Sequence, residues 1–216
     1  FISACIISSV SGIVKAIEPR LTTSGAMAES IIIENDNEYK KIAGFGVERD
    51  YTKLSKDEIR TIIKNAGIVG MGGAAFPTHV KLTPKDENGI THVIVNAAEC
   101  EPYLTSDYRM MLEEPANLIT GLKIILSLFD NAKGVIAIEN NKPDCIETLD
   151  KLLTPEDKNK ICVMPLKAKY PQGAERNLIY AVTGKKINSK MLPADAGVIV
   201  NNVDTLVAIY HAVKLG

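Results

Sequence analysis

From about residue 90 onward, short apolar runs alternate with segments of helical periodicity, and this alternation leaves few folds open to the chain. Residues 90–96 have the pattern of a buried strand. Residues 115–130 place their apolar side chains on one helical face, namely Leu118, Ile119, Leu122, Ile125, Leu126 and Phe129. Strands that alternate with helices form a parallel sheet that is covered on both faces. The predicted fold class is therefore α/β, with a parallel sheet and helices on both faces.

The alternation continues to the end of the chain. Further strands are predicted at 134–139, 161–166 and 198–200, and helices at 143–153, 173–183 and from about 204. One helix, at 55–66, precedes the first of these strands. Ser55 and Glu58 form a capping box at its start, and Gly67 is suited to cap its end.

Residues 1–43 have a different character and read as β structure. Two β-branched runs, at 10–17 and 30–34, flank a turn-rich segment at 22–25. We expect them to be part of a small barrel or sandwich whose other strands precede Phe1. Because the chain starts at Phe1 and has no basic region before it, we interpret it as an internal piece of a larger protein. The predicted domains are 1–43, a partial N-terminal β barrel or sandwich, and 44–216, the α/β domain.

Composition excludes several classes of function. The formal net charge is −1 and no basic stripe is present, which argues against a nucleic-acid-binding protein. The most apolar run, 118–129, is interrupted by Thr120, Lys123 and Ser127, so no membrane insertion is expected. The cysteines form no C-x-x-C pair, so we interpret them as the reduced thiols of a cytosolic protein. Neither a metal site nor an iron–sulfur cluster is predicted within this chain.

A glycine-rich stretch at 70–78 is the strongest candidate for a ligand site. Gly70, Gly72 and Gly73 leave backbone N–H groups bare, so an anionic or planar ligand can approach closely. Gly-x-Gly-x-x-Ala also matches the dinucleotide fingerprint, which requires a preceding strand and a following helix. Here a helix precedes the glycines and Pro77 argues against a helix after them, so we reject a Rossmann site. With Lys81 the loop suits a flavin phosphate and ring; a plain structural turn is the alternative.

Polar residues follow the predicted strands. Ligands of parallel sheets bind beyond the carboxyl ends of the strands, so we expect these residues to gather at one edge. The residues are Asn96, Glu99 and Glu101 after the first strand, Tyr170, Gly173 and Glu175 after the third, and Asn201 and Asn202 after the last. Solvated loops are the alternative for each of them.

Four motifs, in this order, resemble the RnfC subunit of the Rnf ion-translocating ferredoxin:NAD oxidoreductase and, more distantly, the flavin subunit of respiratory complex I. They are GMGGAAFPTHVK at 70–81, NAAECEPYLT at 96–105, KYPQGAE at 169–175 and LPAD at 192–195. Residues 8–12 also resemble the N-terminal barrel of the Rnf subunit, so the resemblance covers essentially the whole chain.

The resemblance implies a domain at which electrons enter a membrane-associated complex. It implies that FMN is bound non-covalently, that NAD(H) stacks over it and that electrons pass on to iron–sulfur clusters. These clusters, and a small β-domain, are expected in a part of the protein after Gly216. Such a chain is an NADH dehydrogenase-type oxidoreductase, peripheral on the cytoplasmic face of the membrane. Its partners are the other subunits and NADH, with ferredoxin only indirectly. No catalytic acid, base or nucleophile is predicted, because hydride passes directly between the two nucleotides.

The resemblance also implies the roles of particular residues. The expected FMN-binding residues are Gly70, Gly72, Gly73, Lys81, Asn96, Glu99, Tyr170, Gly173, Asn201, Asn202 and Thr205. For NADH, Phe76 is expected to stack on the adenine, Glu101 to bind ribose hydroxyls and Glu175 to lie near the nicotinamide.

Three alanines depart from the family patterns. Ala98 and Ala174 stand where the complex I pattern has acidic residues, and Ala75 and Ala174 stand where Rnf subunits often have glycine. A methyl group at these positions crowds a ring that packs against the backbone. The departures favour one alternative, a docking scaffold that has lost the flavin. Another alternative is a related electron-transfer protein that feeds a soluble amino-acid reductase.

Overall fold

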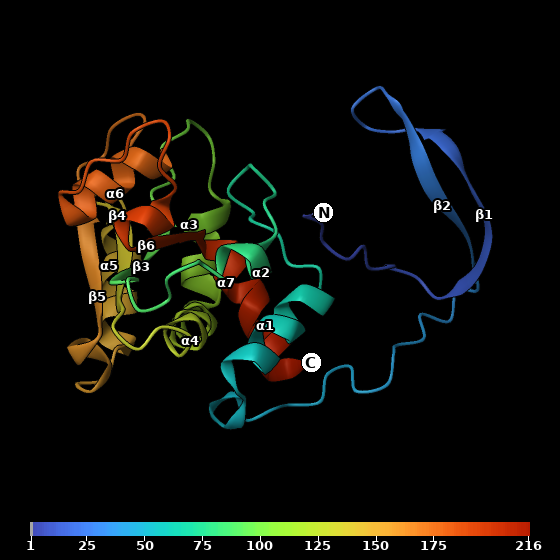
Figure 1. The fold of residues 1–216 in the computed structure, drawn as a ribbon, viewed down its shortest axis with the longest axis horizontal. Helices are drawn as coiled ribbons and strands as arrows, with labels where there is room; N and C mark the ends of the chain where they lie inside the picture. The colour runs from blue at the N-terminus through green and yellow to red at the C-terminus, as the bar shows by residue number, and fades with distance from the viewer. Residues whose placement is uncertain (1) are drawn as a thin grey trace. The chain divides into compact units, whose positions relative to one another are not determined.

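The computed structural model describes residues 2–216; Phe1, on which our expectation about the start of the chain depends, lies outside the described residues. The chain divides into two compact units (Figure 1). One is Ile6–Val47, and the other is Glu48–Gly216 with the short segment that ends at Cys5. The domain boundary expected between residues 43 and 44 stays a prediction.

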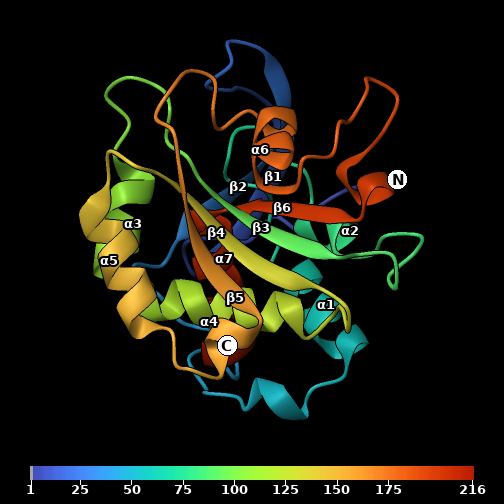
Figure 2. The same cartoon turned by 90° about the vertical axis from the view of Figure 1, so that its left-hand side faces the viewer.

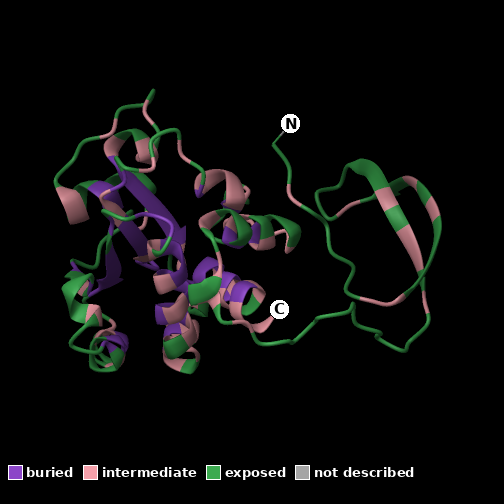
Figure 3. Cartoon of the chain, turned by 60° about the horizontal axis from the view of Figure 1, so that its bottom comes forward, coloured by how far each residue is buried: buried purple, intermediate pink, exposed green. Residues whose placement is uncertain are grey.

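The smaller unit is an antiparallel hairpin. Strand β1 (Gly12–Leu21) pairs with β2 (Met27–Asn35), and the register shifts between Val14 and Ala16. The strands are present where the β-branched runs predicted them, and each is longer than its run. None of the residues 6–47 is buried (Figure 3). A two-stranded hairpin has no second layer within the unit to cover either of its faces.

The larger unit is built on a four-stranded parallel sheet in the order β5-β4-β3-β6 (Figure 2). Its strands are β3 (His92–Ala97), β4 (Lys133–Glu139), β5 (Ile161–Leu166) and β6 (Val198–Asn202). The predicted α/β fold class is confirmed. Because all four strands run in the same direction, their carboxyl ends meet at one edge of the sheet.

Helices connect these strands and cover the sheet. In chain order they are α1 (Lys56–Asn65), α2 (Thr78–Lys81), α3 (Ser106–Glu113), α4 (Pro115–Leu126), α5 (Pro143–Leu152), α6 (Glu175–Thr183) and α7 (Val203–Tyr210). Short 3₁₀ turns occur at Tyr51–Lys53, Asp157–Asn159 and Pro193–Ala196, and a π-helical turn, His211–Leu215, continues α7. Within residues 2–216, no helix combines the length and the apolar character needed to span a bilayer.

Alternate side chains of the strands enter two hydrophobic clusters on opposite faces of the sheet. Val93 and Val95 of β3 belong to the larger cluster, to which α1, α3, α4, α5 and α7 also contribute. Ile94 belongs to the smaller cluster, which includes Leu178 and Ile179 of α6. Helices therefore cover both faces, as predicted, but α6 covers one of them almost alone.

Several element ends follow local sequence rules. Helix α1 begins with the predicted capping box, in which Ser55 accepts the Glu58 N–H and the Glu58 carboxylate accepts the Ser55 N–H. Helices α4 and α5 begin at Pro115 and Pro143, whose missing N–H costs nothing in a first turn. Helix α6 ends before Gly184, which has a φ of +71°.

Other elements were wrongly placed or missed by the sequence analysis. Helix α6 begins at Glu175 rather than Gly173, because Ala174 has an extended backbone. Helix α4 ends at Leu126 rather than at residue 130, because the residues after Leu126 form turns with hydrogen bonds three residues apart. Helix α3 was not predicted. Pro77 was expected to argue against a helix after the glycines, and this was wrong, because Pro77 is the N-cap of the one-turn helix α2.

Candidate functional site

The glycine loop lies between α1 and α2 and packs over the junction of β6 and α7. The Gly70 N–H donates to the Phe76 carbonyl at 2.8 Å, which closes the loop on itself. The Met71 N–H donates to the buried Thr205 hydroxyl at 3.0 Å. A Cβ on Gly72 would lie 3.3 Å from the Cβ of Asn202. The loop is therefore held against two residues that the sequence assigned to the same site.

The outer half of the loop is open and takes an unusual backbone path. Gly73 has a φ of +117°, and a Cβ built there would meet no atom within 4 Å. Ala75 has a φ of +48°, in the left-handed region that residues with a side chain seldom adopt. A side chain at Gly73 would therefore point into free space. The expectation that Gly70 leaves its N–H bare was wrong, because this group donates to the Phe76 carbonyl.

The tip of β3 contacts the loop that precedes α6. The Asn96 side-chain amide donates to the Gly173 carbonyl at 2.8 Å. A Cβ on Gly173 would lie 2.4 Å from the Ala98 carbonyl oxygen, so only glycine permits this approach. The structure thus brings together Asn96 and Gly173, two predicted site residues that are far apart in the sequence.

Glu99 has a clear structural role. Its carboxylate is buried and accepts the N–H groups of Asp107 at 3.0 Å and Tyr108 at 3.3 Å, in the first turn of α3. Both carboxylate oxygens therefore satisfy helix donors, and negative charge at a helix N-terminus is favourable. This cap from outside the helix explains how α3 begins without a capping side chain of its own.

Lys142 links the tips of three strands, and the sequence analysis missed it. Its ammonium lies 4.0 Å from the Glu99 carboxylate after β3 and 3.7 Å from the Glu139 carboxylate at the end of β4. The other oxygen of Glu139 accepts the Lys169 N–H at 3.2 Å, in the loop after β5 that carries Tyr170. The only sequence signal was that Lys142 follows a strand end, which many surface lysines do.

The end of β6 presents two adjacent asparagines in different states. The Asn202 oxygen accepts the Asp204 N–H at 2.9 Å, and its NH₂ group donates to Asp107 at 2.8 Å. Asn201 is only 2% exposed, and neither atom of its amide has a partner among the described residues. A buried amide without hydrogen bonds is costly, so this side chain is suited to a bound polar group.

Titration of this region reflects its burial. Burial raises the pKa of the Asp107 carboxyl to about 6; the Asn202 hydrogen bond opposes this shift, and the Asp204 and Glu99 carboxylates add to it. Burial also raises the pKa of the Asp204 carboxyl, with Glu99 and Glu114 adding to that effect. Negative charge therefore predominates around Asp107, because the Asp204 and Glu99 carboxylates face it together with the single ammonium of Lys142.

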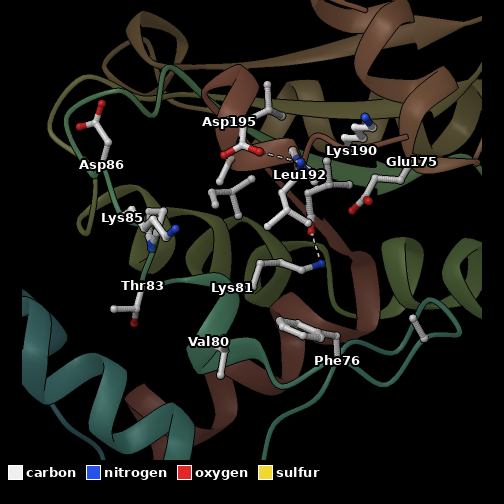
Figure 4. Close-up of a pocket in the computed structure, with 17 residues that line it drawn as sticks. Phe76, Val80, Lys81, Thr83, Lys85, Asp86, Glu175, Lys190, Leu192 and Asp195 are labelled. Atoms are coloured by element: carbon white, nitrogen blue, oxygen red, sulfur yellow. Dashed lines mark hydrogen bonds between the residues drawn. The ribbon is translucent and has the colours of Figure 1, made fainter. Parts of the chain in front are cut away.

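A pocket of about 730 Å³ lies beside the free edge of β6 (Figure 4). Phe76 and Lys81 of the motif 70–81 line it together with Glu175, which begins α6. The Lys81 ammonium donates to the Val200 carbonyl at 2.8 Å. Burial lowers the pKa of Lys81, and the Glu175 carboxylate opposes this shift. Three of the predicted nucleotide-binding residues therefore share one cavity.

The other predicted residues lie outside the lining of this pocket. Asn202 and Thr205 contact the glycine loop, to which Gly70, Gly72 and Gly73 belong, and Asn201 precedes Asn202 at the end of β6. Asn96, Glu99 and Gly173 lie at the tips of the sheet. Glu101 and Tyr170 are exposed on loops, Tyr170 to 74%. The predicted set is thus divided between the pocket, the glycine loop with its contacts, the tips of the sheet and two exposed loops.

Two family descriptions match the chain. The Nuo51 FMN-binding domain matches residues 63–211, and the RnfC barrel sandwich hybrid domain matches residues 1–38. Over its whole length the chain is 43% identical to the C subunit of the proton-translocating ferredoxin:NAD(+) oxidoreductase complex of Clostridium ljungdahlii. The chain belongs to the RnfC family. The N-terminal match also agrees with the predicted barrel or sandwich character of that segment.

Two other relatives of this RnfC-family chain are also C subunits of ion-translocating oxidoreductase complexes. It is 42% identical, again over its whole length, to the C subunit of the Na(+)-translocating ferredoxin:NAD(+) oxidoreductase complex of Acetobacterium woodii. It is 37% identical over 94% of its length to the corresponding subunit of the ion-translocating oxidoreductase complex of Haemophilus influenzae. The chain spans 47%, 48% and 31% of these three relatives, so about half or less of each has a counterpart here.

Solved structures share the fold. A chain of the NAD+-reducing [NiFe]-hydrogenase in its air-oxidized state has a TM-score of 0.64 at 23% identity, covering 77% of this RnfC-family chain and 31% of that chain. The H2-reduced state of that enzyme gives a TM-score of 0.62 at 24% identity, covering 74% and 31%. At these identities the likeness concerns the fold.

The residues present fit a flavin phosphate and ring. The open backbone at Gly73 and the partly buried Lys81 ammonium supply room and positive charge beside the glycine loop, and the unpaired Asn201 amide at the end of β6 supplies neutral hydrogen-bonding groups. Ala98 is buried in the smaller hydrophobic cluster of this RnfC-family chain, so its methyl group packs into the protein. Ala75 and Ala174 are exposed. The departure at Ala98 is therefore compatible with the fold.

Proposed function

We propose that this chain is the flavin domain of an Rnf-type ferredoxin:NAD oxidoreductase, in which hydride passes between NAD(H) and non-covalent FMN. FMN supplies the hydride chemistry and the conversion to single electrons when it is bound. The electrons are then handed to iron–sulfur clusters outside this chain. The complex is membrane-associated, and this domain is peripheral on its cytoplasmic face. Support comes from the family membership and from the names of the relatives.

The observation that carries the proposal is that Phe76, Lys81 and Glu175 share one pocket beside the glycine loop. In the proposal, Gly70, Gly72, Gly73 and Lys81 hold the phosphate and ring of FMN. Asn96, Tyr170, Gly173, Asn201, Asn202 and Thr205 complete the site, with Glu99 at its border.

For NAD(H), we assign Phe76 to the adenine, Glu101 to ribose hydroxyls and Glu175 to the nicotinamide end. The protein positions the two nucleotides, and positioning supplies most of the rate enhancement when no proton transfer is needed.

FMN titration tests the binding step. Adding FMN to the purified chain should quench flavin fluorescence, and adding NADH without oxygen should bleach the yellow colour. The variant Lys81→Ala should weaken FMN binding roughly tenfold or more, because it removes a charged hydrogen-bonding group.

Lys85→Ala is the matched control. Lys85 lines the same pocket but is exposed, and its removal should change FMN affinity less than about threefold. A folded chain that neither quenches flavin fluorescence nor supports bleaching would refute the proposal and favour the flavin-free docking scaffold. Equal effects of the two lysine variants would refute the role of Lys81.

A further inference from the structure

A series of hydrogen bonds and one packing contact runs from the tip of β3 to the glycine loop. It begins with Glu99, whose carboxylate accepts the Asp107 N–H at 3.0 Å and fixes the first turn of α3. It continues with Asp107, whose carboxylate accepts the Asn202 NH₂ group at 2.8 Å. Asn202 is the last residue of β6 and packs beneath Gly72. Segments distant in sequence are thus connected by direct contacts.

The orientation of the Asn202 amide is fixed at both of its ends. The Asp204 backbone N–H requires an oxygen, so the atom 2.9 Å from it is the Asn202 oxygen. The NH₂ group must then face Asp107, whose carboxylate is the acceptor within reach. Removing that carboxylate leaves a part-buried NH₂ group without its partner and frees the side chain to rotate.

The glycine loop depends on the position of Asn202. A Cβ on Gly72 would lie 3.3 Å from the Asn202 Cβ, so the Asn202 side chain lies next to the loop and leaves little room for a side chain at this position. Asn202 is also the N-cap of α7, and Thr205 in the first turn of that helix accepts the Met71 N–H at 3.0 Å. A shift of Asn202 therefore displaces both supports of the loop.

We propose that Asp107 is a positioning residue of the cofactor site, which holds the Asn202 amide and through it the glycine loop. The inference rests on the proposed function, because the loop is assigned there to FMN. Asp107 does not touch the pocket beside β6 and acts only through Asn202. It deepens the proposed function by adding a residue that the four sequence motifs do not include.

The charged groups around Asp107 make its action dependent on pH. Asp204 of α7 and Glu99 before α3 repel its negative charge, and Lys142 before α5 attracts it. With a pKa of about 6, the Asp107 carboxyl gains a proton between neutral and mildly acidic pH. A protonated carboxyl is a weaker acceptor for the Asn202 NH₂ group, so the loop should loosen as the pH falls.

The first experiment compares FMN affinity from about pH 8 to about pH 5 in the wild-type chain and in Asp107→Asn and Asp107→Ala. The amide oxygen of Asp107→Asn still accepts a hydrogen bond, so its affinity at about pH 8 should lie within roughly threefold of wild type. Asp107→Ala should bind FMN about tenfold more weakly. Asp150→Asn, an exposed aspartate of α5, is the control and should match wild type throughout.

The shape of the pH profile separates positioning from simple destabilisation. The phosphate of FMN itself titrates near pH 6, and this contribution is common to all variants. The wild type should lose several-fold more affinity on acidification than Asp107→Asn does. Parallel profiles for these two proteins would overturn the inference, even if Asp107→Ala fails to fold.

A second measurement requires no flavin. Hydrogen exchange of the Met71 amide reports whether the Thr205 hydroxyl still holds the loop. In Asp107→Ala this amide should exchange roughly tenfold faster than in wild type, whereas amides of β4 should be unaffected. Unchanged exchange at Met71 would overturn the inference. If no variant binds FMN, the proposed function fails, and the exchange result still decides the role of Asp107.

Discussion

At the scale of single residues, Ala75 combines a departure from the family with an unfavourable backbone. Its φ is +48°, and the left-handed region costs a residue with a Cβ about 1–2 kcal/mol. The sequence analysis singled out Ala75 because glycine is frequent there in Rnf subunits, and explained the glycine by space for a ring. The backbone provides a second reason, which the sequence did not reveal.

Ala75→Gly should therefore stabilise the chain. We expect an increase of about 1 kcal/mol in the free energy of unfolding, because relief of the left-handed strain outweighs the added freedom of the unfolded state. Ala74→Gly is the matched control. Ala74 is not among the residues with positive φ, so this change should lower stability by about 0.5–1 kcal/mol. Urea unfolding of both variants tests this, and equal effects would contradict the explanation.

Asp107 makes a prediction about stability and pH. The pKa of its carboxyl rises from 3.8 to about 6 on folding, so the folded state binds this proton more tightly than the unfolded state. The resulting stabilisation is fully present below pH 3.8 and is lost as the pH rises through about 6. Asp107→Asn removes the cost of a buried charge. It should unfold with a free energy about 1–2 kcal/mol above wild type near pH 8, after allowance for solvent screening.

The same difference should vanish near pH 4, where the wild-type carboxyl is protonated in the folded state. Thermal unfolding at both pH values, with Asp150→Asn as the control, gives the measurement. A stability difference that stays constant with pH would show that Asp107 does not titrate in this range.

At the scale of elements, the predictable helices and strands are those whose signals lie within their own sequence. Helix α1 has its capping box, α5 begins at its proline, and the strands of the sheet are apolar runs. Helix α3 has no side-chain cap of its own and takes its cap from Glu99, which precedes it by several residues. Such a cap becomes visible only when the chain has turned back on itself.

The candidate site likewise has parts that local sequence predicts and parts that only the fold reveals. The glycine loop and the asparagines of β6 could be predicted because they are local motifs. The links of Asp107 to Asn202 and of Lys142 to Glu99 and Glu139 join loops that follow different strands. Their residue types are common on surfaces, so composition and spacing carry no signal for them. The topology of the sheet brings them together.

The packing of α4 against α7 depends on one glycine. A Cβ on Gly121 would lie 2.2 Å from the Leu206 carbonyl oxygen, and backbone atoms cannot move aside cheaply. Gly121→Ala should therefore lower the free energy of unfolding by about 2–4 kcal/mol, although alanine favours helix.

Thr120→Ala, the neighbouring change on α4, should cost less than about 0.5 kcal/mol, since its hydroxyl bonds only to the Ala116 carbonyl one turn back. Chemical denaturation measures both variants. A neutral or stabilising effect of Gly121→Ala would mean that the two helices separate without loss of packing.

At the scale of the whole molecule, the folding energy is concentrated in one unit. Among the described residues, every member of the two hydrophobic clusters comes from Ile59 or later. The hairpin of β1 and β2 leaves apolar side chains such as Ile17 and Leu21 exposed. Since burial of apolar surface is the dominant stabilising contribution, the α/β unit should fold without the hairpin.

A chain that begins at Glu48 should therefore unfold cooperatively, with a melting temperature within a few degrees of that of the full chain. Its FMN affinity should lie within about twofold of that of the full chain. This truncation removes the close approach of the Cys5 carbonyl to Gly67, which follows α1. A chain that begins at Ile68 is the contrasting case, because it also removes Ile59 and Ile63, which are buried in the larger cluster. It should lose the cooperative transition, since large gaps in a core cost several kcal/mol each. Calorimetry and FMN titration on the two shortened chains decide the matter: if the chain from Glu48 also loses its transition, residues before it stabilise the α/β unit by interactions other than apolar burial.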